Sequence, residues 1–425
     1  MASDYPDSYE SESALRGRRD ELLALRKILA TGDRQVTRET ADALTREGDA
    51  LLATTLLLMC AAQRRDVDTV GEILQSPAAD LLRAEVIFDY ALIWCVYWAA
   101  GLAAARPEIE RSRARGWGGL PPDWSRDLVH LAALADALGE SDPRMHCLTR
   151  SEAPLLEGQS LLVTQAVING LPPAYFIVDT GAPTTVISAE YAEQAGIGFG
   201  AESYKESRDG AGHTIRMYPA VLKSLAIGSA SALNCPVHVL ELSKKLAVKG
   251  IISPLESFRE AFVEIDMRSR ALRISPPEFL SRWRGEAGEP VRSQELLWNE
   301  GSPSVPVRVD DQHEGFFLLD SGAGANILCA HLCRRLGLDI STSPHVESAT
   351  AASQTLVYRG PRGKLAVGDA AARDTDFIVK ECSAAPETLF PRMVDGYVGV
   401  PWFEGRRVGF APGGRTMYFT DASRA

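Results

Sequence analysis

The chain has 425 residues, 24% of them charged and 45% of hydrophobic types, with a formal net charge of −11. This length exceeds one ordinary domain, and the composition is typical of a folded protein rather than a disordered one. The negative balance argues against a polyanion partner, so we expect no nucleic acid to bind. The polar, acidic start and the seven scattered cysteines without CxxC spacing favour reduced thiols and a cytoplasmic protein.

An α-helical domain is predicted over residues 1–145. Leu22, Leu25 and Leu29 recur at helical spacing, and residues 51–62 are apolar on most sides, as in the central helix of a bundle. The uncharged stretch 90–105 is shorter than the roughly 20 residues that span a bilayer, so a buried helix is favoured over membrane contact. The sequence leaves open whether this domain recruits substrates, mediates self-association or blocks an active site.

An all-β region is predicted after about residue 142. Short runs rich in β-branched and aromatic residues are separated there by Gly and Pro. Residues 276–303 carry several charges and look like a connection between two β units.

The β region contains one pattern twice. In each copy an apolar run precedes an acidic loop, and the two loops are Asp179-Thr180-Gly181-Ala182 and Asp320-Ser321-Gly322-Ala323. The two aspartates are 141 residues apart (320 − 179). Three further landmarks repeat in the same order at nearly this distance, namely residues 195–197 and 336–338, 225–228 and 365–368, and 250–252 and 396–398. A duplicated unit is indicated.

These repeated motifs resemble those of the pepsin and retroviral-protease superfamily of aspartic peptidases, in which each lobe supplies one aspartate. The resemblance implies a two-lobed acid-protease β fold, with retropepsin-like lobes at 155–290 and 291–421. It implies Asp179 and Asp320 as the catalytic pair, with no metal and no organic cofactor. In this family the hydroxyls at the Thr180 and Ser321 positions reach across to the opposite loop and join the two halves.

Paired carboxylates explain how such a site could hydrolyse a peptide bond. Two carboxylates held close cannot both ionise, so they share a proton, and one can accept a proton from water while the other polarises the carbonyl. Gly181 and Gly322 leave room for a tight turn and for N–H groups near the carboxylates. Ala182 and Ala323 stand where relatives often carry a hydroxyl, and the missing donor predicts a higher dyad pKa and activity nearer neutral pH.

Two substrate-covering hairpins, or flaps, are predicted. Residues 204–218 form the first candidate, with Gly210, Ala211 and Gly212 near its tip, and residues 347–358 form the second, with Ala351 and Ala352. The alternative for each is a plain surface hairpin.

Two local features complicate this interpretation. The first copy has Ser253-Pro254 where the second has Gly399-Val400, which weakens its match to the family pattern. Cys329, His331 and Cys333 suggest a metal site, but His331 would point away from the shared helix face, so packed thiols are expected instead.

The predicted function is that of an aspartic endopeptidase performing limited or regulatory proteolysis of a polypeptide near neutral pH. The main alternative is an inactive binding or scaffold protein that keeps the fold. A weaker one makes the helices a membrane-surface anchor.

Overall fold

The computed structural model describes residues 12–156, 160–200, 203–208, 213–243, 247–286, 288–311, 313–340, 343–349, 354–382 and 394–421. The chain divides into two compact units, with helices up to Ala132 in one and the β region from Ala133 onward in the other. The predicted fold class, a helical N-terminal region followed by a two-lobed β region, is confirmed.

The helical region consists of short helices joined by tight turns. They are α1 (Glu12–Leu29), α2 (Arg34–Arg46), α3 (Ala50–Gln63), α4 (Val67–Gln75), α5 (Pro77–Ala84), α6 (Val86–Ala100), α7 (Leu102–Arg115) and α8 (Pro122–Leu138). The leucine stripe of α1 is buried, with Leu22, Leu25 and Leu29 exposed by 4% or less. Helix α3 is apolar almost all round because α2 and α6 pack against it.

Helix α6 is the buried helix that the uncharged stretch 90–105 predicted, but it begins and ends earlier than this stretch. Gly101, with φ of 92°, ends it and starts α7. Its one acidic residue, Asp89, is buried, and burial raises the pKa of this carboxyl although Arg115 lies 2.6 Å away. In the described part of the chain, no helix combines the length and apolar character needed to cross a membrane.

The first copy of the β repeat forms an eight-stranded sheet in the order β1-β8-β5-β9-β4-β3-β7-β6. Its strands are β1 (Arg144–His146), β3 (Val163–Ile168), β4 (Ala174–Val178), β5 (Val186–Ser188), β6 (Lys205–Arg208), β7 (Thr214–Ile227), β8 (Ala230–Leu240) and β9 (Gly250–Ile252). Two short helices accompany them, α9 (Ala189–Gln194) and α10 (Pro254–Ser257).

The second copy forms another eight-stranded sheet in the order β13-β14-β15-β20-β16-β19-β18-β17. Its strands are β13 (Leu297–Asn299), β14 (Ser302–Val309), β15 (His313–Leu319), β16 (Asn326–Cys329), β17 (His345–Ala349), β18 (Gln354–Val367), β19 (Arg373–Lys380) and β20 (Gly396–Val398). The short helices are α12 (Ala330–Arg335) and α13 (Val400–Phe403). The β4–β9 and β15–β20 pairs are both parallel, so the sequence repeat is also a repeat of topology.

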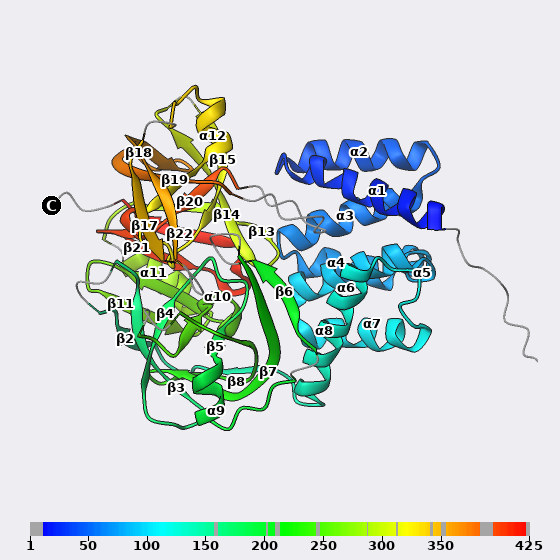
Figure 1. Cartoon of the computed structure of the whole chain (residues 1–425), viewed down its shortest axis with the longest axis horizontal. Coiled ribbons are helices and arrows are strands. Elements are labelled where there is room, and N and C mark those ends of the chain that lie inside the picture. Colours follow the sequence, from blue (N-terminus) through cyan, green and yellow to red (C-terminus); the bar gives the residue numbers. More distant parts are fainter. Residues whose placement is uncertain are drawn as a thin grey trace, which may run out of the picture. The chain divides into compact units, whose positions relative to one another are not determined.

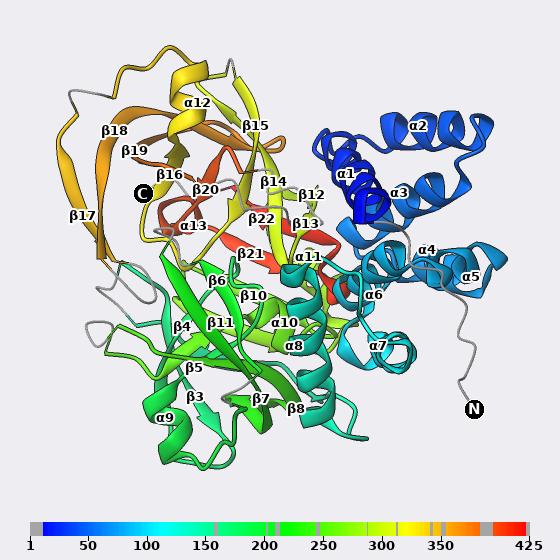
Figure 2. The same cartoon turned by 45° about the vertical axis from the view of Figure 1, so that its right-hand side comes forward.

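A third, six-stranded sheet joins the two copies. It has the order β12-β22-β21-β10-β11-β2, built from β2 (Ser151–Pro154), β10 (Phe262–Asp266), β11 (Ala271–Ser275), β12 (Val291–Glu295), β21 (Arg407–Phe410) and β22 (Thr416–Thr420). The copies meet where β10 pairs antiparallel with β21. Helix α11 (Phe279–Glu286) and the 3₁₀ turn η2 (Pro412–Gly414) flank these strands. In Figure 1 and Figure 2 the green strands of the first copy and the yellow and orange strands of the second lie on opposite sides of β21 and β22.

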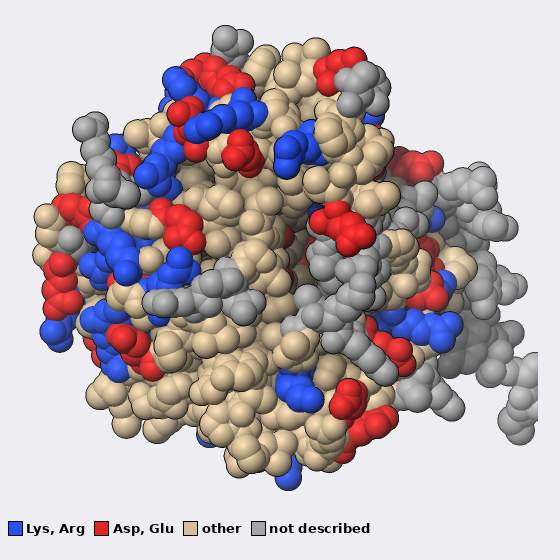
Figure 3. All heavy atoms as spheres, turned by 60° about the vertical axis from the view of Figure 1, so that its left-hand side comes forward, with Lys and Arg blue, Asp and Glu red and all other residues tan. Residues whose placement is uncertain are grey.

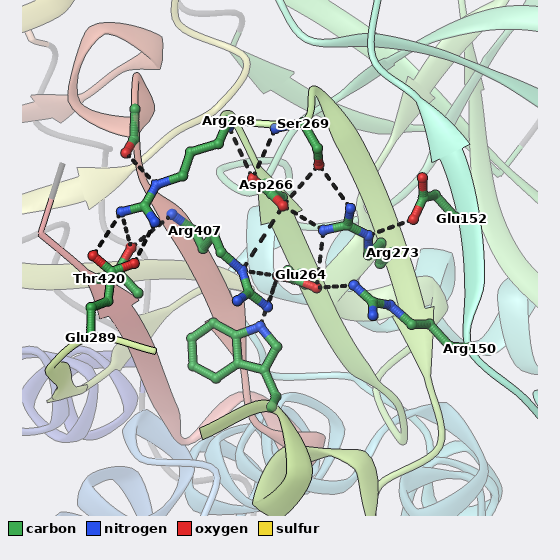
Figure 4. Close-up of polar contacts among 12 residues, drawn as sticks. Arg150, Glu152, Glu264, Asp266, Arg268, Ser269, Arg273, Glu289, Arg407 and Thr420 are labelled. Atoms are coloured by element: carbon green, nitrogen blue, oxygen red, sulfur yellow. Dashed lines mark hydrogen bonds and ion pairs between the residues drawn. The ribbon is translucent and has the colours of Figure 1, made fainter. Parts of the chain in front are cut away.

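A charged network crosses the central sheet, as Figure 4 shows. Glu264 on β10 is 1% exposed and accepts hydrogen bonds from Arg407 on β21 (2.8 Å) and from Trp283 on α11 (2.7 Å). Asp266 accepts hydrogen bonds from the side chains of Arg273 (2.6 Å) and Ser269 (2.8 Å). Burial opposes the ionisation of Asp266, but the hydrogen bonds to its carboxylate outweigh burial and lower its pKa. Because Glu264 and Arg407 come from different copies, the network ties the two halves together.

One expectation about the cysteines is wrong. Cys329 and Cys382 form a disulfide with a Cα–Cα distance of 5.3 Å, whereas reduced, packed thiols were predicted from their spacing. Parallel pairing of β16 with β19 places Cys329 opposite Lys380, two residues before Cys382, and so brings the two sulfurs together. The other cysteines are free thiols, namely Cys60, Cys95, Cys147, Cys235 and Cys333.

Candidate active site

Each acidic loop directly follows a strand inside its lobe. The first follows β4 and the second follows β15, and both strands pair in parallel with a later strand of the same lobe. The main-chain N–H of Asp179 donates to Ile252 O and that of Asp320 to Val398 O, each at 2.9 Å. Equivalent backbone hydrogen bonds therefore hold the start of both loops in the same way.

Reciprocal hydrogen bonds join the two loops. The N–H of Thr180 donates to Ser321 Oγ at 2.9 Å, and the N–H of Ser321 donates to Thr180 Oγ1 at 3.0 Å. Each hydroxyl then donates to a carbonyl of the opposite strand, Thr180 to Leu319 O at 2.7 Å and Ser321 to Val178 O at 2.9 Å. Both hydroxyl residues are almost fully buried. The contact that the family resemblance implied for Thr180 and Ser321 is present.

The carboxyl groups of Asp179 and Asp320 come together at the centre of this arrangement, so that a proton held by one can be shared with the other. Asp179 Oδ1 accepts from the N–H groups of Gly181 (2.8 Å) and Ala182 (3.0 Å), and Asp320 Oδ1 accepts from Gly322 (2.9 Å). Main-chain donors thus hold each carboxylate from its own loop.

The glycines are required by the opposite carboxylate rather than by an unusual turn. A Cβ on Gly322 would lie 2.5 Å from Asp179 Cγ, and one on Gly181 would lie 2.9 Å from Asp320 Cγ. Any side chain there would force the two carboxylates apart. This crowding is a second reason for the Asp-x-Gly pattern, beyond the approach of N–H groups.

Both carboxyl groups have raised pKa values. Burial is the main cause for Asp179, the charge of Asp320 adds to it, and together they hold its pKa well above the usual range. Burial also raises the pKa of Asp320, but the hydrogen bond from Asp179 and the positive charge of Lys380 partly counteract this. The pair is therefore suited to sharing one proton.

The departure at Ser253-Pro254 is compensated within the first lobe. In the second lobe, the N–H of Val400 donates to Ala323 O at 2.8 Å. Pro254 occupies the corresponding place and has no N–H, but the hydroxyl of Ser253 donates to the equivalent Ala182 O at 2.6 Å. The two lobes therefore support their acidic loops by one hydrogen bond from different donors.

A second support is also matched between the lobes. Asn326 Oδ1 accepts from the N–H of Gly399 at 2.8 Å, and Thr185 Oγ1 accepts from the N–H of Ser253 at 3.0 Å. Gly399 has no room for a side chain, because a Cβ would lie 2.1 Å from Ala325 O. The first lobe has Ser253 at the position equivalent to Gly399, so only the second lobe requires a glycine there.

The predicted flaps correspond to two antiparallel hairpins. Strands β6 and β7 pair with Lys205 opposite Met217, and β17 and β18 pair with His345 opposite Tyr358. The tip residues named from the sequence, Gly210, Ala211, Gly212, Ala351 and Ala352, lie outside the described residues. Whether the tips cover a substrate stays a prediction.

Sequence reasoning missed several residues around the loops. Ser302 donates through Oγ to Gly181 O at 2.7 Å, and the charge of Lys380 acts on Asp320. The repeat itself carried a signal for Lys380, since its counterpart 140 residues earlier (380 − 240) is Leu240. Within the described ranges no group of His, Cys, Asp and Glu side chains could hold a metal ion, and His331 instead contacts Asp395 at 3.2 Å.

Two family matches agree with this geometry. Residues 164–250 match a family model described as "gag-polyprotein putative aspartyl protease", and residues 305–402 match one described as "Aspartyl protease". No protein of curated function matches the sequence. Among solved structures, the chain is similar to conglutin gamma, a basic 7S globulin from lupine seeds, with 11% identity and a TM-score of 0.40 over 67% of this chain and 96% of that one. Each family match includes one acidic loop, so the two lobes of the β region are similar to retropepsin-like aspartic peptidase lobes.

Proposed function

We propose that this protein is an aspartic endopeptidase in which Asp179 and Asp320 activate a water molecule. The observation that supports this best is the set of reciprocal hydrogen bonds between the Thr180 and Ser321 loops, which holds one carboxyl from each lobe against the other. A structural role alone would not require two carboxyl groups to be buried together, because that burial costs free energy.

In the proposed reaction the dyad begins with one shared proton. When that proton is on Asp179, Asp320 is ionised and acts as the base. Asp320 takes a proton from water as the water oxygen bonds to the scissile carbonyl carbon, and Asp179 gives its proton to the carbonyl oxygen. The resulting diol then returns one proton to Asp179. Asp320 protonates the leaving nitrogen as the C–N bond breaks, so the dyad ends with one proton again.

The substrate in this proposal is an extended polypeptide lying between the two hairpins, β6–β7 and β17–β18. Raised carboxyl pKa values favour activity nearer neutral pH than that of free carboxylates, in line with the missing hydroxyls at Ala182 and Ala323. Limited or regulatory proteolysis is the proposed role, and the helical unit could direct it towards a partner.

A cytoplasmic location is part of the proposal and rests on the free cysteines alone. The Cys329–Cys382 bond argues against it. Thiol labelling of the protein directly on cell lysis, with and without prior reduction, measures whether Cys329 and Cys382 are oxidised or reduced in the cell.

The decisive experiment compares the wild-type chain with Asp179→Asn and Asp320→Asn on a peptide library between about pH 4 and 8. These substitutions keep the side-chain shape but remove the shared proton. We expect each to abolish cleavage while circular dichroism stays unchanged. Equal cleavage by all three proteins would show that the activity belongs to something else. Peptide binding without cleavage by the wild type would favour a scaffold protein.

A further inference from the structure

The two lobes differ in the surface beside their acidic loops. In the first lobe an apolar cluster contains Val163, Ile177, Val186, Leu240 and Ile251. Ala182 from the acidic loop, and Ile215 and Met217 from the hairpin strand β7, pack against it. The cluster therefore lies between the loop and the hairpin, on the side where a substrate would bind.

The corresponding cluster in the second lobe is smaller and more polar. Leu318, Cys329 and Val394 form it, with Cys382 and Tyr397 packed against them. The sheet registers define the equivalent positions. Val163 pairs with Ile177 as Ser304 pairs with Leu318, and Leu240 pairs with Ser188 as Lys380 pairs with Cys329. Two apolar residues of the first lobe are thus replaced by a serine and a lysine.

Lys380 is the change with the largest chemical consequence. Its counterpart Leu240 is 3% exposed, whereas the Lys380 side chain is partly exposed. Its Nζ lies 3.8 Å from the centre of the Tyr397 ring, and its charge acts on Asp320. Tyr397 in turn replaces Ile251 of the first lobe. An ammonium group held over an aromatic ring therefore stands beside the acidic loop, where the other lobe has only hydrocarbon.

The chain around Lys380 is also fixed in place. Lys380 ends β19, which pairs with β16 up to Cys329. The disulfide from Cys329 to Cys382 closes two residues further on. The equivalent first-lobe positions, Ser188 and Leu242, carry no such link. Restraint on both sides limits the positions that the ammonium can reach.

We infer that Lys380 is a specificity-determining residue, which selects substrates carrying an Asp or Glu side chain where the peptide passes the second lobe. This inference rests on the proposed peptidase function. The apolar cluster of the first lobe would take an apolar side chain on the other side of the cleaved bond. In a partly buried site an ion pair is screened less than in water, so the carboxylate should be clearly preferred over its amide.

The test uses peptides that differ only by Glu or Gln at each position flanking the cleaved bond. For the wild type, we expect the Glu peptide to exceed the Gln peptide by about tenfold in kcat/KM at one position, the range of a charged hydrogen bond. Lys380→Leu, which copies Leu240, should remove this ratio, and Lys380→Glu should reverse it in favour of a Lys peptide. Lys223→Leu on the exposed part of β7 is the matched control and should leave the ratio unchanged.

The Glu-to-Gln ratio is used because a change in the pKa of Asp320 affects both peptides equally and cancels. Cleavage with the same ratio in the wild type and in Lys380→Leu overturns the inference and leaves the peptidase function intact. If the wild type cleaves nothing, binding of the same peptides to the Asp179→Asn variant by fluorescence anisotropy gives a separate reading. Equal affinity for the Glu and Gln peptides at every position there also overturns the inference.

Discussion

The two lobes share a hydrogen-bond frame but differ in the surfaces that the frame supports. Thr180 and Ser321 exchange equivalent bonds, and Ala182 O and Ala323 O each accept one supporting bond. Beside this frame, Leu240 and Ile251 in the first lobe are replaced by Lys380 and Tyr397 at the equivalent positions of the second. Symmetry is thus retained where two carboxyls must meet and is lost where side chains could meet a substrate. The difference separates residues that build the site from residues that tune it.

The largest effect is expected from breaking the frame at its most crowded point. Gly322→Ala places a methyl group 2.5 Å from Asp179 Cγ, and Gly181→Ala places one 2.9 Å from Asp320 Cγ. We expect both to lower kcat/KM by about a hundredfold or more, because displaced carboxyls lose their alignment, with Gly322→Ala the more severe. Gly285→Ala on α11, where a Cβ meets nothing within 4 Å, is the control. Wild-type activity in Gly322→Ala would contradict the observed approach of the two loops.

The next largest effect concerns the disulfide of the second lobe, which has no counterpart at the equivalent positions of the first lobe. The Cys329–Cys382 bond closes a loop of 53 residues, for which chain entropy predicts a contribution of about 4 kcal/mol to the free energy of unfolding. Replacing both cysteines by serine should lower the denaturant midpoint accordingly. Reductant should do the same to the wild type and nothing to the double variant. A reductant effect of equal size in both proteins would assign the stabilisation elsewhere.

A smaller effect should show that Ser253 and Val400 perform the same task. Ser253→Ala leaves Ala182 O without its donor, at a cost of about 1–3 kcal/mol in unfolding free energy. Pro254→Val supplies the N–H that Val400 uses in the second lobe, so Ser253→Ala should cost less in that background. A double-mutant cycle by chemical denaturation measures this difference. Strict additivity would mean that the two donors are not equivalent.

The smallest effect concerns the ionisation of the dyad. Lys380 lowers the pKa of Asp320, so Lys380→Leu should raise it. If activity requires ionised Asp320, the acidic limb of the pH profile of kcat/KM should move to higher pH, and Lys223→Leu should leave it in place. A limb that moves to lower pH would contradict the stabilising effect of the Lys380 charge on ionised Asp320.

The repeated motifs of the sequence predicted that the two acidic loops form a pair, and the resemblance to aspartic peptidases implied the hydroxyl exchange. The sequence also predicted the helical unit from its leucine spacing and the buried course of α6. It did not predict the Cys329–Cys382 bond, since this depends on the parallel register of β16 and β19, which spacing along the chain does not reveal. The significance of Lys380 was missed because the repeat aligns it with Leu240 but does not show that its charge acts on Asp320.

The central sheet determines how the two halves of the β region should behave when they are expressed as separate chains. Its middle contact, β10 against β21, joins strands from different copies, and each copy contributes three neighbouring strands to one half of the sheet. A half expressed alone would present an open strand edge at that seam. The unpaired N–H and C=O groups of such an edge can pair with a strand of another chain, and the same half of another molecule offers an equivalent edge. Half-length chains should therefore assemble in pairs or aggregate, and mixing the two halves should restore a heterodimer.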